Sequence, residues 1–167
     1  MALSLYCCHY TYILAQVHGT HYTVRKAFHL LELTIRLDTY PALSFTVIVN
    51  PDSGPGTNTL SDPNYARELP KLNSRKNVQT IGYVRTTWAT RNISDVLQDV
   101  STYSSWAENK TADYQVHGIF YDEAPSTYSS ETAAFMKTLD EHAKAQVGFG
   151  GINFVLPLSI SLISARS

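Results

Sequence analysis

The chain has 167 residues, of which 44% are hydrophobic and 16% charged, and its formal net charge is −1. This length fits one domain, and the composition is that of a globular rather than a disordered protein. A net charge so close to zero gives no electrostatic reason to expect nucleic acid or an anionic membrane surface as a partner.

The first 39 residues show no regular alternation of apolar and polar positions, so we treat them as an atypical N-terminal segment. Cys7 and Cys8 are adjacent, and adjacent cysteines seldom bridge each other, so no disulfide framework is expected. The moderately apolar stretch 2–17 lacks a basic start and is interrupted by polar side chains. It is therefore a poor signal peptide and is too short and polar for stable insertion into a membrane.

From Leu43 onward, short apolar runs alternate with segments of helical spacing. Strands are expected at 45–49, 78–84, 116–121 and 152–156, and helices at 65–72, from a cap at Asn92, and from Ser129 or Ser130 to Gly148. This order predicts an α/β fold with parallel strands joined by right-handed crossovers. Four such units fit either a small doubly wound sheet or half of a (β/α) barrel, because a complete barrel needs about 250 residues.

Asn92 also begins the tripeptide Asn-Ile-Ser, an acceptor sequence for glycosylation. A glycan on this side chain would compete with its use as a helix cap, and both interpretations remain open. The residues 157–167 contain apolar side chains but no turn, cap or following helix, so they are treated as an atypical C-terminal tail.

Asp122 and Glu123 end the most apolar of the predicted strands. In α/β sheets and barrels, the carboxyl ends of strands are where substrates bind. A glycosidase needs two carboxyl groups, roughly 5–5.5 Å apart for retention and 6.5–9.5 Å apart for inversion. If the strand stays regular through Glu123, only one of the two faces the barrel axis and works with a third acid from another strand. Alternatively, Asp122 caps the next loop and Glu123 is solvated.

Two predicted loops carry side chains suited to sugars. In the turn-rich stretch 50–56, Asn50 and Asp52 offer hydrogen bonds for hydroxyl groups, although the stretch could equally be only a tight connection. Trp88 could stack on a pyranose ring, although packing in the core is the commoner role of tryptophan. His18 and His21 lack a third ligand at a convincing spacing, so no metal or other cofactor is expected.

Four motifs in order resemble the spherulation-specific family 4 (spherulin-4-like) proteins, which are similar to glycoside hydrolase family 135. They are F-T-V-I-V-N-P-D-S-G-P-G (45–56), N-V-Q-T-I-G-Y-V-R-T (77–86), V-H-G-I-F-Y-D-E-A-P (116–125) and G-F-G-G-I-N-F (148–154). The resemblance implies a (β/α)8 barrel of the TIM type, with about four βα units present over residues 40–156 and incomplete at both ends. It also implies extracellular or cell-surface enzymes that hydrolyse galactosamine-containing polysaccharide, of the endo-α-N-acetylgalactosaminidase type.

Carried over by position, Asp122 and Glu123 match the family's catalytic acidic pair. Residues that match its barrel mouth are Asn50, Asp52, Tyr83 and Arg91, to which we add Trp88. The family's first strand is not found before Leu43, and a later strand that brings a further catalytic Glu is absent after Phe154. The chain is therefore expected to be truncated and inactive, and the alternative is a non-catalytic carbohydrate-binding remnant. The spacing D-x-x-D-x-D-x-E of chitinase-like barrels is missing, and the oligomeric state is left open.

Overall fold

The computed structural model describes residues 12–17, 20–24, 37–39, 41–56, 63–149 and 152–157, with the main chain alone described in 12–17, 20–24 and 152–157. The predictions for Cys7, Cys8, His18 and the tail beyond Pro157 lie outside these residues. Within them, one sheet has the strand order β2-β1-β3-β4-β5-β6. Its strands are β1 Tyr12–Val17, β2 Thr20–Val24, β3 Ser44–Val49, β4 Val78–Arg85, β5 Gly118–Ala124 and β6 Ile152–Pro157.

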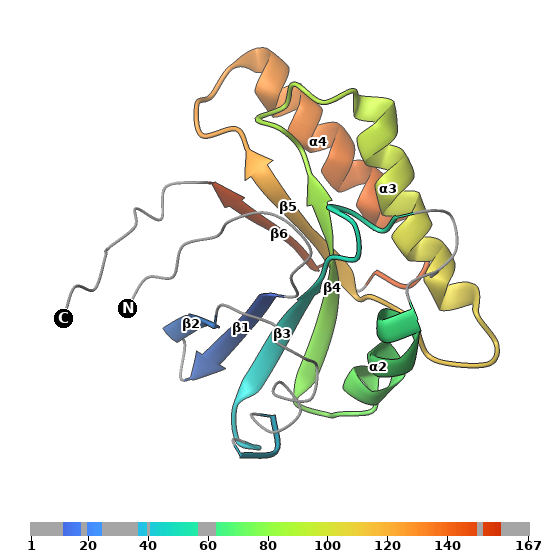
Figure 1. Cartoon of the computed structure of the whole chain (residues 1–167). Coiled ribbons are helices and arrows are strands. Elements are labelled where there is room, and N and C mark those ends of the chain that lie inside the picture. The colour runs from blue at the N-terminus through green and yellow to red at the C-terminus, as the bar shows by residue number, and fades with distance from the viewer. Residues whose placement is uncertain are drawn as a thin grey trace.

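The strands β3, β4, β5 and β6 are parallel and stand side by side in chain order. The helices that connect them are α2 Pro63–Asn73, α3 Ile93–Ser105 and α4 Ser130–Ala145, with the short 3-10 helix η1 Trp106–Glu108 after α3. Figure 1 shows all three α-helices on one side of the sheet. The predicted α/β class with a parallel sheet is thus confirmed, and each predicted strand and helix after Leu43 is present.

The first two strands differ from the prediction. β1 and β2 pair with each other in antiparallel fashion, with Val17 opposite Thr20, and β1 is also antiparallel to β3. Strands joined by a two-residue connection can pair only in this way, because parallel pairing requires a long crossover. Part of segment 1–39 therefore extends the same sheet, where the sequence suggested no regular structure and only parallel strands.

The main core lies between the sheet and the helices. Alternate strand residues face the helices, among them Val49, Val84, Ile119 and Tyr121. Gly82 lies where the ring of Tyr103 from α3 crosses β4, and a Cβ there would come within 2.7 Å of that ring. The Tyr103 hydroxyl donates a hydrogen bond to the Val49 carbonyl at 2.8 Å, which fixes α3 against the sheet.

Local signals explain where two helices begin. The Asn92 side chain accepts a hydrogen bond from the Ser94 amide at 2.9 Å, as expected for an N-cap of α3. Ser129 and Thr132 exchange side-chain and main-chain hydrogen bonds in a capping box before α4. In the part of the chain that the structure describes, no helix is both long and apolar enough to cross a membrane.

Candidate functional site

The parallel strands β3, β4 and β5 end at the same edge of the sheet, and the loops that follow them meet there. These loops and strand ends carry most of the residues that the sequence predicted for the site. Along β4 and β5, side chains alternate between the helix face and the opposite face of the sheet. Tyr83 and Arg85 belong to the opposite face, because Gly82 and Val84 pack against helices.

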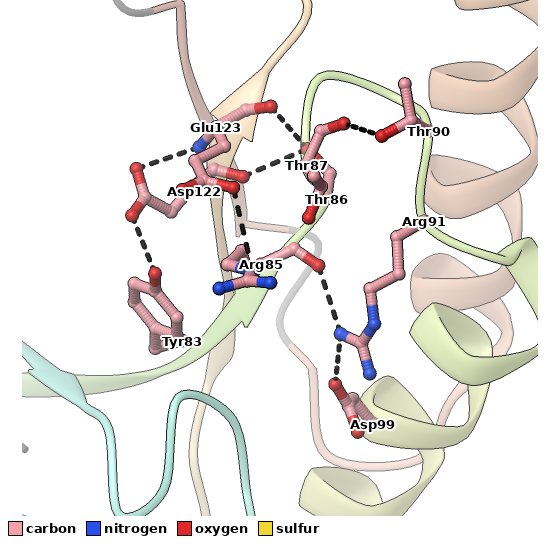
Figure 2. Close-up of polar contacts among 9 residues, drawn as sticks. All are labelled: Tyr83, Arg85, Thr86, Thr87, Thr90, Arg91, Asp99, Asp122 and Glu123. Carbon is pink, nitrogen blue, oxygen red and sulfur yellow. Dashed lines mark hydrogen bonds and ion pairs between the residues drawn. The ribbon is translucent and has the colours of Figure 1, made fainter. Parts of the chain in front are cut away.

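Asp122 lies on this same face and is fixed through both carboxylate oxygens. Its Oδ2 accepts a hydrogen bond from the buried Tyr83 hydroxyl at 2.6 Å, and its Oδ1 accepts one from the Glu123 amide at 2.8 Å. Figure 2 shows Tyr83 from β4 pointing toward Asp122. Short hydrogen bonds to an ionised oxygen are stronger than those between neutral groups, so they hold the Asp122 carboxylate in one orientation.

Glu123 breaks the regular strand. Its φ is 53°, in the left-handed region, and the pairing of β5 with β6 shifts register between Tyr121 and Ala124. The two acids therefore sit in a β-bulge, which turns Glu123 so that its Oε2 lies 3.6 Å from Arg85 Nε. The strand therefore does not stay regular through Glu123, as one prediction assumed. Both carboxylates contact side chains from one face of β4. The left-handed residue costs roughly 1–2 kcal/mol, which the surrounding contacts must offset.

The Oε2 atom of Glu123 is buried and has no hydrogen-bond donor among the described residues. The Arg85 nitrogen at 3.6 Å is close enough for an ion pair but too far for a hydrogen bond. A buried oxygen without a donor is costly and calls for a specific explanation. Here the Arg85 guanidinium lies beside the buried Oε2 and offsets part of that cost, while 20% of the Glu123 side chain remains exposed.

The loop after β4 is wound in an unusual conformation. Thr87, Trp88 and Ala89 have φ values of 51°, 53° and 65°, although none is glycine. The Trp88 amide donates to the Glu123 carbonyl at 2.6 Å, and Thr90 bonds back to the Thr87 carbonyl through its amide and its hydroxyl. Trp88 is 51% exposed at the edge that carries the acids, so packing in the core is wrong for this residue. Stacking of its ring on a pyranose stays a prediction.

Arg91 and Asn50 have other contacts. Arg91 Nη1 lies 2.6 Å from Asp99 Oδ2 on α3 and 3.0 Å from the Arg85 carbonyl, so its guanidinium points away from the acidic pair. Asn50 is buried and its side-chain oxygen accepts from the Gly54 amide at 3.0 Å. Burial raises the pKa of Asp99 above its ordinary value, and the Arg91 guanidinium opposes that rise. These residues shape the loops behind the acids.

Asp52 is exposed on the same loop as Asn50, and its amide donates to the Gly54 carbonyl at 3.1 Å. Among the residues that the structure describes, no three His, Cys, Asp or Glu side chains gather as metal ligands. Arg85 and Thr86 were not among the residues to which the sequence assigned binding or catalysis. The position of Arg85 two residues after Tyr83, on one strand face, could have indicated its role, whereas no sequence pattern indicates the contacts of the Thr86 hydroxyl.

Three comparisons with known proteins agree. The model of a family described as spherulation-specific family 4 matches residues 30–157. Spherulin-4 of Physarum polycephalum is 31% identical over 109 residues, which are 65% of this chain and 29% of that protein. The crystal structure of Aspergillus clavatus Sph3 in complex with GalNAc has a TM-score of 0.70 and 41% identity, covering 74% of this chain and 50% of that one. The chain thus spans half, or less, of the length of these relatives.

Proposed function

Because this chain belongs to spherulation-specific family 4, we propose that it is a glycoside hydrolase-like domain for galactosamine-containing polysaccharide. The observation that carries the proposal is the bulge that brings Asp122 and Glu123 to one face at the carboxyl end of β5. The GalNAc complex of Sph3, which is 41% identical, supports an amino sugar as the ligand.

We further propose that β3 to β6 are consecutive strands in the wall of a (β/α)8 barrel. In a doubly wound sheet the order of the strands reverses at one point, and helices cover both faces. Here the strand order follows the chain order and the helices lie on one side, which is the arrangement of a barrel wall. On this proposal, the face that carries Tyr83 and Asp122 lines the barrel interior near its carboxyl end.

The two acids have different surroundings and therefore take different roles. Asp122 already accepts a hydrogen bond at each oxygen, which suits a fixed negative charge beside a transition state that develops positive charge on the sugar. The Glu123 side chain is 20% exposed beside Arg85, which suits exchange of a proton with the glycosidic oxygen or with water. A third carboxylate from another strand would complete the set for endo-α-N-acetylgalactosaminidase chemistry.

Binding of the sugar needs an apolar surface as well as acids. We assign this role to Trp88, which is exposed. Its main-chain amide donates a hydrogen bond to the Glu123 carbonyl, and this bond holds the residue beside the acids. No cofactor is required for carboxylate chemistry of this kind. We also propose that the protein acts outside the cell or at its surface, where polysaccharides of this class occur.

The test uses α-linked oligomers of galactosamine and N-acetylgalactosamine with the parent chain and with Asp122→Asn and Glu123→Gln. We expect the parent to bind the oligomers, and any release of shorter products by the parent to fall at least about 100-fold in both variants. Glu141→Gln, an exposed acid on α4, is the matched control and should behave as the parent. Release that survives both substitutions contradicts the proposal. Binding without any release by the parent indicates the carbohydrate-binding remnant instead.

A further inference from the structure

The buried hydroxyl of Thr86 contacts the main chain of both acids. Its Oγ1 lies 2.9 Å from the Asp122 carbonyl oxygen and 2.7 Å from the Glu123 carbonyl oxygen. The residue is fully buried directly after the last β4 position that pairs with β5. A hydroxyl has one hydrogen to donate, so the two carbonyls share it in a three-centred bond.

Two main-chain bonds reinforce this contact. The Thr86 amide donates to the Asp122 carbonyl at 3.0 Å, and the Trp88 amide donates to the Glu123 carbonyl at 2.6 Å. The two carbonyls belong to the peptide planes on either side of the Glu123 Cα atom. Holding both planes fixes the φ and ψ of Glu123, whose φ of 53° departs from the regular strand.

From this geometry we infer that Thr86 is a positioning residue whose hydroxyl holds the Glu123 carboxylate on the same face as Asp122. The inference rests on the proposed function, because it assigns to Thr86 the geometry that the acidic pair needs. The regular pairing of β4 with β5 ends at Arg85 and Asp122. Beyond that pair, the hydrogen bonds of the Thr86 hydroxyl fix the backbone of β5, as regular strand pairing does before it. A left-handed glutamate persists only where its surroundings over-determine it.

The experiment compares Thr86→Val with Thr80→Val in the 167-residue chain. Thr80 is the matched control, since it is a buried threonine near the start of β4, and its hydroxyl donates to Asn73 Oδ1 and the Gln115 carbonyl, away from the acids. Amide hydrogen exchange measured by NMR at Glu123 and Trp88 reports the bulge directly, without any substrate. We expect Thr86→Val to speed exchange of both amides about tenfold and Thr80→Val to leave them unchanged.

Thr86→Ser keeps the hydroxyl and should restore slow exchange. If the valine variant does not fold, Thr86→Ala and Thr86→Ser provide the same comparison, because they differ only in the hydroxyl. Exchange that is unchanged in Thr86→Val, or equally fast in Thr86→Ala and Thr86→Ser, overturns the inference. So does equal acceleration in Thr80→Val.

A second readout separates this inference from the proposed function. If the parent chain cleaves the galactosamine oligomers, Thr86→Val should lower kcat about tenfold with KM changed less than twofold, and Thr86→Ser should recover most of the loss. A change in KM alone overturns the positioning role. If the parent neither binds nor cleaves them, the proposed function fails, while the exchange rates still decide whether the Thr86 hydroxyl holds the bulge.

Discussion

Replacing Arg91 with methionine tests whether this residue shapes the loops rather than the ligand site. The substitution keeps most of the aliphatic length but removes the charge beside Asp99 and the donor to the Arg85 carbonyl. Breaking a fully buried ion pair costs about 3–5 kcal/mol. Because 26% of the Arg91 side chain and 19% of the Asp99 side chain remain exposed, we expect a smaller loss of about 2 kcal/mol at neutral pH. In a chain of this size, that lowers the unfolding midpoint by about 4–8 °C.

The loss should depend on pH in a definite direction. Burial raises the pKa of Asp99, the Arg91 guanidinium opposes that rise, and the nearby Asp95 carboxylate adds to it. Without Arg91, the pKa of Asp99 is therefore raised further. An acid whose pKa is higher in the folded state than in the unfolded state contributes fully to stability below its unfolded pKa. That contribution is lost as the pH rises through the folded pKa. The deficit of Arg91→Met should therefore be small near pH 4 and grow toward about pH 7.

Thermal unfolding followed by circular dichroism measures this deficit at several pH values. The double variant Arg91→Met with Asp99→Asn should lose the pH dependence, because it lacks the buried carboxylate. Lys144→Met is the control, since it breaks an exposed pair with Asp140 and should change stability by less than about 1 kcal/mol. A deficit of equal size at both ends of the pH range would refute the reasoning.

Four further substitutions have expected outcomes. Gly82→Ala should destabilise the fold by about 1–3 kcal/mol in chemical denaturation, because its Cβ would meet the Tyr103 ring at 2.7 Å, and an unchanged midpoint would contradict this contact. Asn92→Ala should cost about 1 kcal/mol in the same assay, whereas Asn92→Ser should retain the helix cap. Trp88→Ala should leave stability within about 0.5 kcal/mol and weaken binding of galactosamine oligomers about tenfold in calorimetry; unchanged affinity would exclude stacking on this ring. Tyr83→Phe removes a donor from Asp122 and should slow release of sugar about tenfold, with Tyr121→Phe, whose hydroxyl bonds the Leu139 carbonyl, as the control.

Much of the α/β layer could be predicted because its signals are local. Apolar runs mark β3, β4 and β5, and Asn92 and Ser129 begin α3 and α4 where their side chains can cap a helix. The strand predicted at 116–121 is β5, which begins at Gly118 rather than at Val116 and continues through the acids to Ala124. Apolar content predicted where the strand lies, but its bounds depend on pairing with its neighbours.

The bulge could not be predicted, because Glu123 is not a residue type that favours the left-handed region. Its conformation depends on hydrogen bonds from Thr86 and Trp88, which lie more than thirty residues earlier in the chain. The same holds for Arg91, whose partner Asp99 becomes a neighbour only once α3 has formed. Residues 1–39 lack a regular alternation of apolar and polar positions, so that pattern could not predict the antiparallel hairpin of β1 and β2.

The alternation of β4 separates the effects of substitutions at neighbouring positions. Gly82 and Val84 pack against the helices, whereas Tyr83 and Arg85 contact the acidic pair. A change at Val84 therefore acts on packing alone, a change at the 43% exposed Arg85 acts on the contact with Glu123 alone, and a change at the buried Tyr83 acts on both.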